Sequence, residues 1–81
     1  MNKEIAQIIA LVADRTRSDI GSLARLVKEH CDEESHKEFS MAIGQVVYEI
    51  SHELMDRVFD KFPDIRSEME DRLKKYGRSY Y

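Results

Sequence analysis

The sequence predicts an all-α fold, in which two long helices form an antiparallel hairpin and a shorter third helix follows. Apolar residues recur at steps of three and four through most of the chain, which is the spacing of helical stripes. Three glycines and one proline among 81 residues leave little of the turn chemistry that an all-β domain needs. This length suits a single helical domain spanning residues 1–81, and one cysteine rules out an internal disulfide framework.

The first helix is expected over residues 2–31. Thr16 keeps the stripe in phase across the polar segment between Val12 and Ile20, so one helix explains the pattern better than two helices with a joint. A bend between Thr16 and Gly21 stays open at this point. The stripe, expected to be buried, comprises Ile5, Ile8, Ile9, Val12, Thr16, Ile20, Leu23, Leu26 and Val27, and ends at His30 and Cys31.

A polar turn at residues 32–35 separates the first helix from a second one, expected over residues 36–62. Ser35-x-x-Glu38 matches a capping box, in which the serine hydroxyl and the glutamate side chain satisfy amides of the first helical turn. The stripe that follows is the strongest helical signal in the chain. It comprises Phe39, Ala42, Ile43, Val46, Val47, Ile50, Leu54, Val58 and Phe62, with Met55 and Phe59 widening it.

Pro63 predicts the corner that ends the second helix. A proline disfavours helical geometry in the residue before it and suits the first turn of a new helix. The third helix is therefore expected over residues 64–76. Gly77 supplies a left-handed terminator, and residues 77–81 are expected to form a short flexible tail.

The composition predicts a cytoplasmic protein. No uncharged run exceeds the ten residues from Phe39 to Tyr48, whereas a membrane-spanning helix needs about 18. The residues after Met1 do not resemble a secretory signal peptide. The net charge of −3 arises in the segment 28–38, with two lysines and five acids, and this acidity disfavours nucleic acid as a partner.

The expected helix lengths predict a homodimer. A third helix half as long as the others can cover only part of the hairpin, so apolar surface is left for a second copy. The sequence therefore indicates a small non-enzymatic module for protein interaction or regulation, acting as a homo-oligomer with a possible further protein partner. The interface is expected at the widened stripe of the second helix, namely Ile43, Val47, Ile50, Leu54, Met55, Val58 and Phe59.

A metal-binding helical bundle is the first alternative. Glu49 and His52 have the E-x-x-H spacing of di-iron bundles, and Asp19 would lie level with Glu49 on the partner helix of the hairpin. However, taking Ile50 as the centre of the buried stripe, Glu49 lies about 100° to one side and His52 about 160° to the other. Neither side chain then faces the bundle interior, as such sites require.

A zinc site at the turn is a second metal hypothesis. His30, Cys31 and His36 offer imidazole and thiolate ligands among the acidic residues of this segment. Structural zinc sites pair two separated ligand pairs, and this spacing is absent around the single cysteine. The sequence therefore predicts no metal and no cofactor.

Catalysis and DNA binding have weaker support. The acids around Cys31 disfavour a reactive thiolate, and the chain has no phosphate-binding loop or nucleophile elbow. We therefore expect no enzyme. The segment 16–27 superficially resembles a helix-turn-helix around Gly21, with Arg15, Arg17 and Arg25 nearby, which makes a DNA-binding regulator a further alternative. The unbroken phase of the stripe argues against a turn there.

Overall fold

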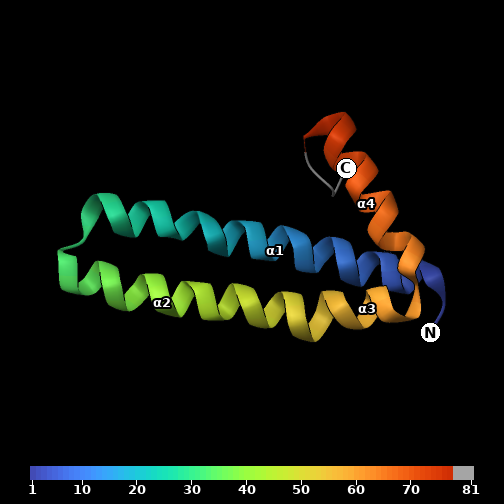
Figure 1. The fold of residues 1–81 in the computed structure, drawn as a ribbon, viewed down its shortest axis with the longest axis horizontal. Coiled ribbons are helices and arrows are strands. Elements are labelled where there is room, and N and C mark those ends of the chain that lie inside the picture. Colours follow the sequence, from blue (N-terminus) through green and yellow to red (C-terminus); the bar gives the residue numbers. More distant parts are fainter. Residues whose placement is uncertain (78–81) are drawn as a thin grey trace.

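The computed structural model describes residues 1–77 and shows an antiparallel helical hairpin with a third helical arm (Figure 1). Helix α1 (Lys3–His30) forms one side of the hairpin. Helix α2 (Glu33–Ile50), a π-helical turn (Ser51–Met55) and α3 (Asp56–Lys61) form the other side as one rod, and α4 (Pro63–Tyr76) follows. The predicted all-α class is confirmed. Of the predicted tail, residues 78–81 lie outside the described residues.

Helix α1 is continuous, as its unbroken stripe predicts. The side chain of Asn2 accepts a hydrogen bond from the Ile5 amide at 3.0 Å and so caps the first turn. The helix passes through Thr16 and Gly21 without a break. The unbroken helix excludes the turn that a helix-turn-helix would need around Gly21. The helix ends where Cys31 takes an extended conformation.

The predicted cap of the second helix is wrong. Asp32, and not Ser35, is the capping residue, because its carboxylate accepts the Ser35 amide at 2.7 Å. Helix α2 therefore begins at Glu33, three residues before the predicted start. Asp32 has the extended backbone of a cap, and Ser35 lies at the third helical position, where its amide needs an acceptor. The hydrogen bond lowers the pKa of Asp32.

The π-turn explains the width of the stripe in the second helix. In this turn the Asp56 amide bonds to the Ser51 carbonyl, five residues back, so the turn contains one residue more than an α-helical turn. Ile50 is half-buried and Met55, five residues later, is buried. The apolar side chains before and after the turn thus stay on the inner side, and Leu54 between them remains exposed.

The corner before α4 is confirmed. Phe62 leaves helical geometry with φ −137° and ψ 77°, and Pro63 occupies the first turn of α4. Gly77 ends α4 with φ 76°, the left-handed conformation that glycine adopts without strain. Figure 1 shows α4 leaving the open end of the hairpin at an angle, so that only its first turns lie near the other helices.

The core lies at the open end of the hairpin. Helix α1 contributes small side chains, which let neighbouring helices approach closely, and α4 contributes Ile65 and Met69. The predicted buried stripe of α1 is wrong here, because Ile8 and Val12 are about half exposed. The buried hydrophobic residues are Ala6, Ala10, Ala13, Met55, Val58, Ile65 and Met69.

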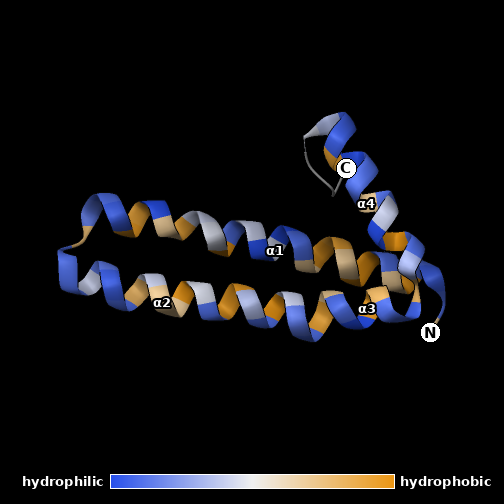
Figure 2. Cartoon of the chain, in the orientation of Figure 1, coloured by the Kyte–Doolittle hydropathy of each residue, from blue (hydrophilic) through white to orange (hydrophobic). Residues whose placement is uncertain are grey.

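The outer half of the hairpin has no core of its own. From Arg15 to Leu54, no residue falls in the buried class. Leu23 and Leu26, expected to be buried, are exposed to 41% and 54%. Figure 2 shows apolar residues continuing along both long helices well beyond the point that α4 reaches.

Polar contacts fasten the first turns of α4 to the start of α1 and to α3. The Lys3 ammonium pairs with Asp64 and, at 2.8 Å, with Glu68. Gln7 donates to the other oxygen of Glu68 at 3.1 Å, and the Arg66 guanidinium lies 4.8 Å from the Phe59 ring centre. These contacts set the position of the first two turns of α4.

Enlarging an alanine of the core should destabilise the fold. Ala10 is fully buried, so Ala10→Leu should lower the free energy of unfolding by about 1–3 kcal/mol through overpacking. Ala24→Leu makes the same change at an exposed position of α1 and should stay within about 0.5 kcal/mol of the parent chain. Urea denaturation measures both. Equal losses in the two variants would contradict this location of the core.

Acid should loosen α4 from α1. The hydrogen bonds from Lys3 lower the pKa values of Asp64 and Glu68, and the two carboxylates raise the pKa of Lys3. The stabilisation is then complete above the unfolded pKa values of these carboxylates and is lost as the pH falls through their lowered folded values. In the alkaline range it is lost only as the pH rises through the raised pKa of Lys3.

Amide hydrogen exchange measures this loosening. Protection factors of the first turns of α4 should fall between pH 7 and pH 3 in the parent chain, by more than those of the α2 amides. In Lys3→Met the protection should already be lower at pH 7 and change less with acid, because the cation that holds both carboxylates is gone. A parent chain in which α4 and α2 respond alike would argue against this anchor.

Candidate functional site

The main candidate site is an apolar surface along the hairpin, which we call the hairpin face. Its residues come from both long helices and are exposed or half-buried. They are Ile5, Ile8, Val12, Leu23 and Leu26 from α1, and Phe39, Val46, Ile50 and Leu54 from α2 and the π-turn.

Helical geometry places the hairpin face away from α4. Ala10 and Val12 are two residues apart, about 200° around α1, so the alanine that packs in the core and the valine point to opposite sides. Leu23 is eleven residues beyond Val12, about three turns, and Leu26 is eighteen residues beyond Ile8, about five turns. The exposed side chains therefore form one straight stripe along α1.

A groove joins the two helices on this face. It has a volume of about 440 Å³, and Thr16 is its one polar lining residue among those described. A smaller hollow of about 190 Å³ adjoins it and shares Ile9 and Leu54 with it. The groove is lined by Ile8, Ile9, Val12, Ala13, Thr16, Ile50 and Leu54. Charged residues of the hollow, Glu53, Arg57 and Lys61, form its rim near the open end.

The residues predicted to form the interface divide into two groups. Met55 and Val58 are buried in the chain's own core, and Phe59 packs against that core, so their side chains serve the contact with α1 and α4. Ile43, Val47 and Ile50 are half-buried along the hairpin, where Ile50 also packs against the core, and Leu54 is exposed to 47%. Only this second group keeps surface on the hairpin for a contact with another protein.

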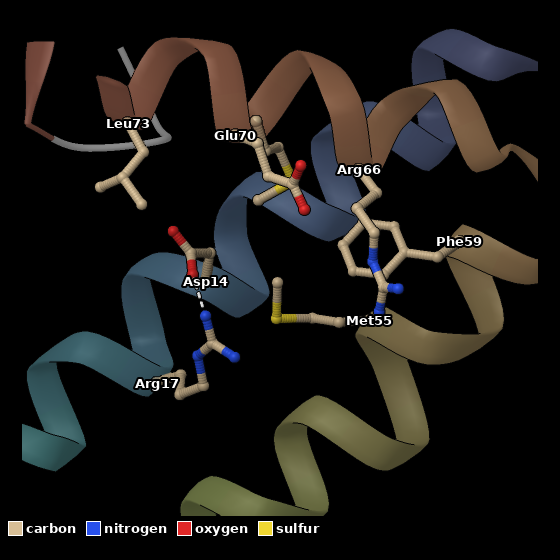
Figure 3. A pocket seen from close by; sticks show the side chains of 8 residues that line it. Asp14, Arg17, Met55, Phe59, Arg66, Glu70 and Leu73 are labelled. Carbon is tan, nitrogen blue, oxygen red and sulfur yellow. Dashed lines mark hydrogen bonds and ion pairs between the residues drawn. The ribbon is translucent and has the colours of Figure 1, made fainter. Parts of the chain in front are cut away.

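A second hollow lies between α1, α3 and α4 (Figure 3). It has a volume of about 310 Å³ and combines Met55, Phe59 and Leu73 with charged side chains. Asp14, only 7% exposed, pairs with Arg17, whose other nitrogen donates to the Ser51 hydroxyl at 3.0 Å. The charges near this hollow thus link α1 to the beginning of the π-turn.

The structure places the two halves of the E-x-x-H pair in separate interactions. Glu49 accepts a hydrogen bond from Gln45 at 2.8 Å. The His52 ring stacks on Tyr48, with centres 5.6 Å apart, and its Nδ1 lies 3.8 Å from an Asp56 oxygen. Among residues 1–77, no group of three His, Cys, Asp or Glu side chains is placed to hold a metal ion.

The remaining metal candidates lie near the tip of the hairpin or along α1. His30 and Asp19 are exposed and His36 is half-buried. Cys31 is an exposed free thiol, so the expectation that it ends a buried stripe is wrong. Its exposure follows from its position in the tight turn, where the chain leaves α1 and no other element covers it.

Within the described residues, no helix is both long enough and apolar enough to cross a bilayer.

Comparisons with protein families, with characterised proteins and with solved structures find no match for this chain.

The sequence pattern identified the residues of the hairpin face but not their exposure. Ile8, Val12, Leu23 and Leu26 were expected to be buried, because periodicity alone shows which side chains share a side of a helix. The signal that could have identified the covered side is the second stripe, Ala6, Ala10 and Ala13, at steps of four and three. Small residues at helical spacing favour close helix packing, and large ones beside them are then left outside.

Proposed function

We propose that this protein is a small non-enzymatic module for protein interaction, which acts as a homo-oligomer through the hairpin face. The observation that carries this proposal is the lack of any buried residue between Arg15 and Leu54, although both helices present large apolar side chains there. Folding of such a segment must offset about 1–2 kcal/mol of backbone entropy per residue. A partner that covers the face supplies the missing apolar contacts.

The polar contacts of the outer half cannot replace those apolar contacts. Arg17 donates to Ser51 across the inner end of this segment, whereas Arg25 pairs with Glu29 at 3.0 Å and Gln45 donates to Glu49, each within one helix. The pairs within one helix stabilise it by about 0.2–0.5 kcal/mol each and add nothing between helices. By contrast, complete burial of one Leu or Val side chain contributes about 1.5–3 kcal/mol. Covering the half-exposed leucines and valines of the face is therefore the larger available gain.

The alternative functions have no comparable support. The metal hypothesis lacks a convergent ligand set within residues 1–77, as described above. The DNA-binding hypothesis needs a turn at Gly21, and α1 continues through this residue. A regulatory or cytoplasmic role is compatible with an interaction module, and both stay proposals.

A charge on the hairpin face should weaken self-association. Leu26 on α1 and Leu73 on α4 are the same residue type with the same exposure, 54%, on different surfaces. Leu26→Glu should raise the dissociation constant of the oligomer at least about 100-fold, because each of two copies would bury an unpaired carboxylate. Leu73→Glu, the matched control, should leave it within about threefold.

Sedimentation equilibrium over a range of concentrations gives these constants, and circular dichroism checks that both variants stay helical. A parent chain with the mass of one copy at micromolar concentration would overturn the homo-oligomer. An oligomer that Leu73→Glu disrupts and Leu26→Glu does not would move the interface to α4 instead.

A further inference from the structure

We infer that the occupant of the hairpin face is a second copy of this chain, packed face to face about a two-fold axis with the two hairpin tips at opposite ends. This inference rests on the proposed function and gives it a geometry. The axis lies in the interface, runs across the helices, and crosses α1 at the level of residue 17 and α2 at the level of Val46. Each α1 then lies antiparallel on the partner's α1, and each α2 on the partner's α2.

The hairpin face has the size that a stable dimer needs. The molecule is 45 Å long, and two helices side by side are about 20 Å wide, which gives a face of about 900 Å². Stable interfaces bury about 800 Å² per partner. Because α4 lies on the other side of α1, it does not obstruct a second hairpin.

The stripe of α1 is self-complementary in this arrangement. A two-fold axis at the level of residue 17 pairs each residue of α1 with the partner residue that lies equally far on the other side of residue 17. The two residue numbers then add up to about 34. Ile8 then faces the partner's Leu26, and Val12 faces the partner's Leu23. All four side chains are exposed in the single chain. Both pairs are apolar, and by the symmetry each occurs twice in the dimer.

The charged residues in the middle of the stripe fit the same axis. Asp19 and Arg15 are both exposed on α1, close to its midpoint. Their numbers also sum to 34, so Asp19 of one copy faces the partner's Arg15. Opposite charges at the centre of the interface thus lie within reach of each other, flanked by apolar pairs, and they help to fix the register.

The stripe of α2 gives a matching axis. In the hairpin, residue 17 of α1 lies about level with residue 46 of α2, since the chain turns at residues 31–32. Val46, 46% exposed, then lies on the axis against the partner's Val46. Phe39 faces the partner's Leu54, and Ala42 faces the partner's Ile50. Each contact pairs apolar groups, as those along α1 do.

The opposite arrangement, with both tips at one end, is less favourable. The tip segment, residues 28–38, carries a net charge of −3, so two tips side by side repel each other. With the tips apart, each tip lies near the rim of the partner's hollow, which includes Arg57 and Lys61. In the tips-together dimer, Asp19 would also face the apolar stripe of the partner's α2 near Val46.

The single native cysteine provides the test, because Cys31 is exposed at the tip. A spin label on Cys31 of the unmodified sequence, measured by pulsed dipolar spectroscopy, should give a distance close to the 45 Å length of the molecule. Tips that lie together would bring the two labels within about 20 Å, because packed helices have axes only about 10 Å apart.

A second measurement uses the axis itself. Val46→Cys in a Cys31→Ser background should form an intermolecular disulfide under mild oxidation, because residues on the axis meet within bridging range. The parent chain, with Cys31 alone, should not crosslink under the same conditions. Gln45→Cys in the Cys31→Ser background, one position around the helix, is the matched control and should crosslink at least about tenfold more slowly.

The outcomes separate this inference from the proposed function. A dimer with a long Cys31 distance and efficient crosslinking of Val46→Cys supports both. A dimer with close Cys31 labels, or one in which Cys31 itself crosslinks readily, overturns the inference and leaves the homo-oligomer standing. A single-copy mass at labelling concentration overturns both, and a trimer or larger ring overturns the two-fold geometry.

Discussion

The close packing of α1 alanines against α3 and α4 is the contact on which the rest of the structure depends. Ala6, Ala10 and Ala13 leave room for Met55 and Ile65 at the open end of the hairpin. Every hydrophobic residue of the buried class within residues 1–77 belongs to this cluster. Because the small residues point towards the core, their large neighbours on α1 must point elsewhere. The core therefore determines both where the chain buries its apolar side chains and which side of α1 it exposes.

The π-turn allows the rod of α2, the π-turn and α3 both to complete the core and to line the groove. Its extra residue brings Met55 and Val58 into the core while Ile50 stays along the hairpin. Leu54 is left at the groove, next to Ile8 and Val12 of α1. A regular helix with these residues would rotate one of the two groups out of place, since one residue corresponds to about 100°. The hydrogen bond from Arg17 to Ser51 lies where this change begins.

The helices could largely be predicted from the sequence, but which side of each helix is buried could not. Pro63 and Gly77 act through local backbone geometry, so their effects follow from residue type alone. The cap at Asp32 was missed because Ser35 offered an equally good local pattern, and only the chain path at the turn distinguishes them. Val12 was expected to be buried because it lies in the apolar stripe of α1. Its burial depends on which side of α1 another helix covers, and α4 covers the alanine side.

The location of α4 has a further consequence for a two-fold assembly. Ala10 and Val12 point to opposite sides of α1, so a second copy on the hairpin face leaves the hollow beside α4 uncovered. That hollow keeps Asp14, Arg17, Arg66 and Glu70 on its lining. Assembly and any contact made beside α4 would therefore use different surfaces of the same short chain. The alanine stripe separates the hairpin face from the hollow beside α4, because it fixes α4 to one side of the hairpin and leaves the other side uncovered.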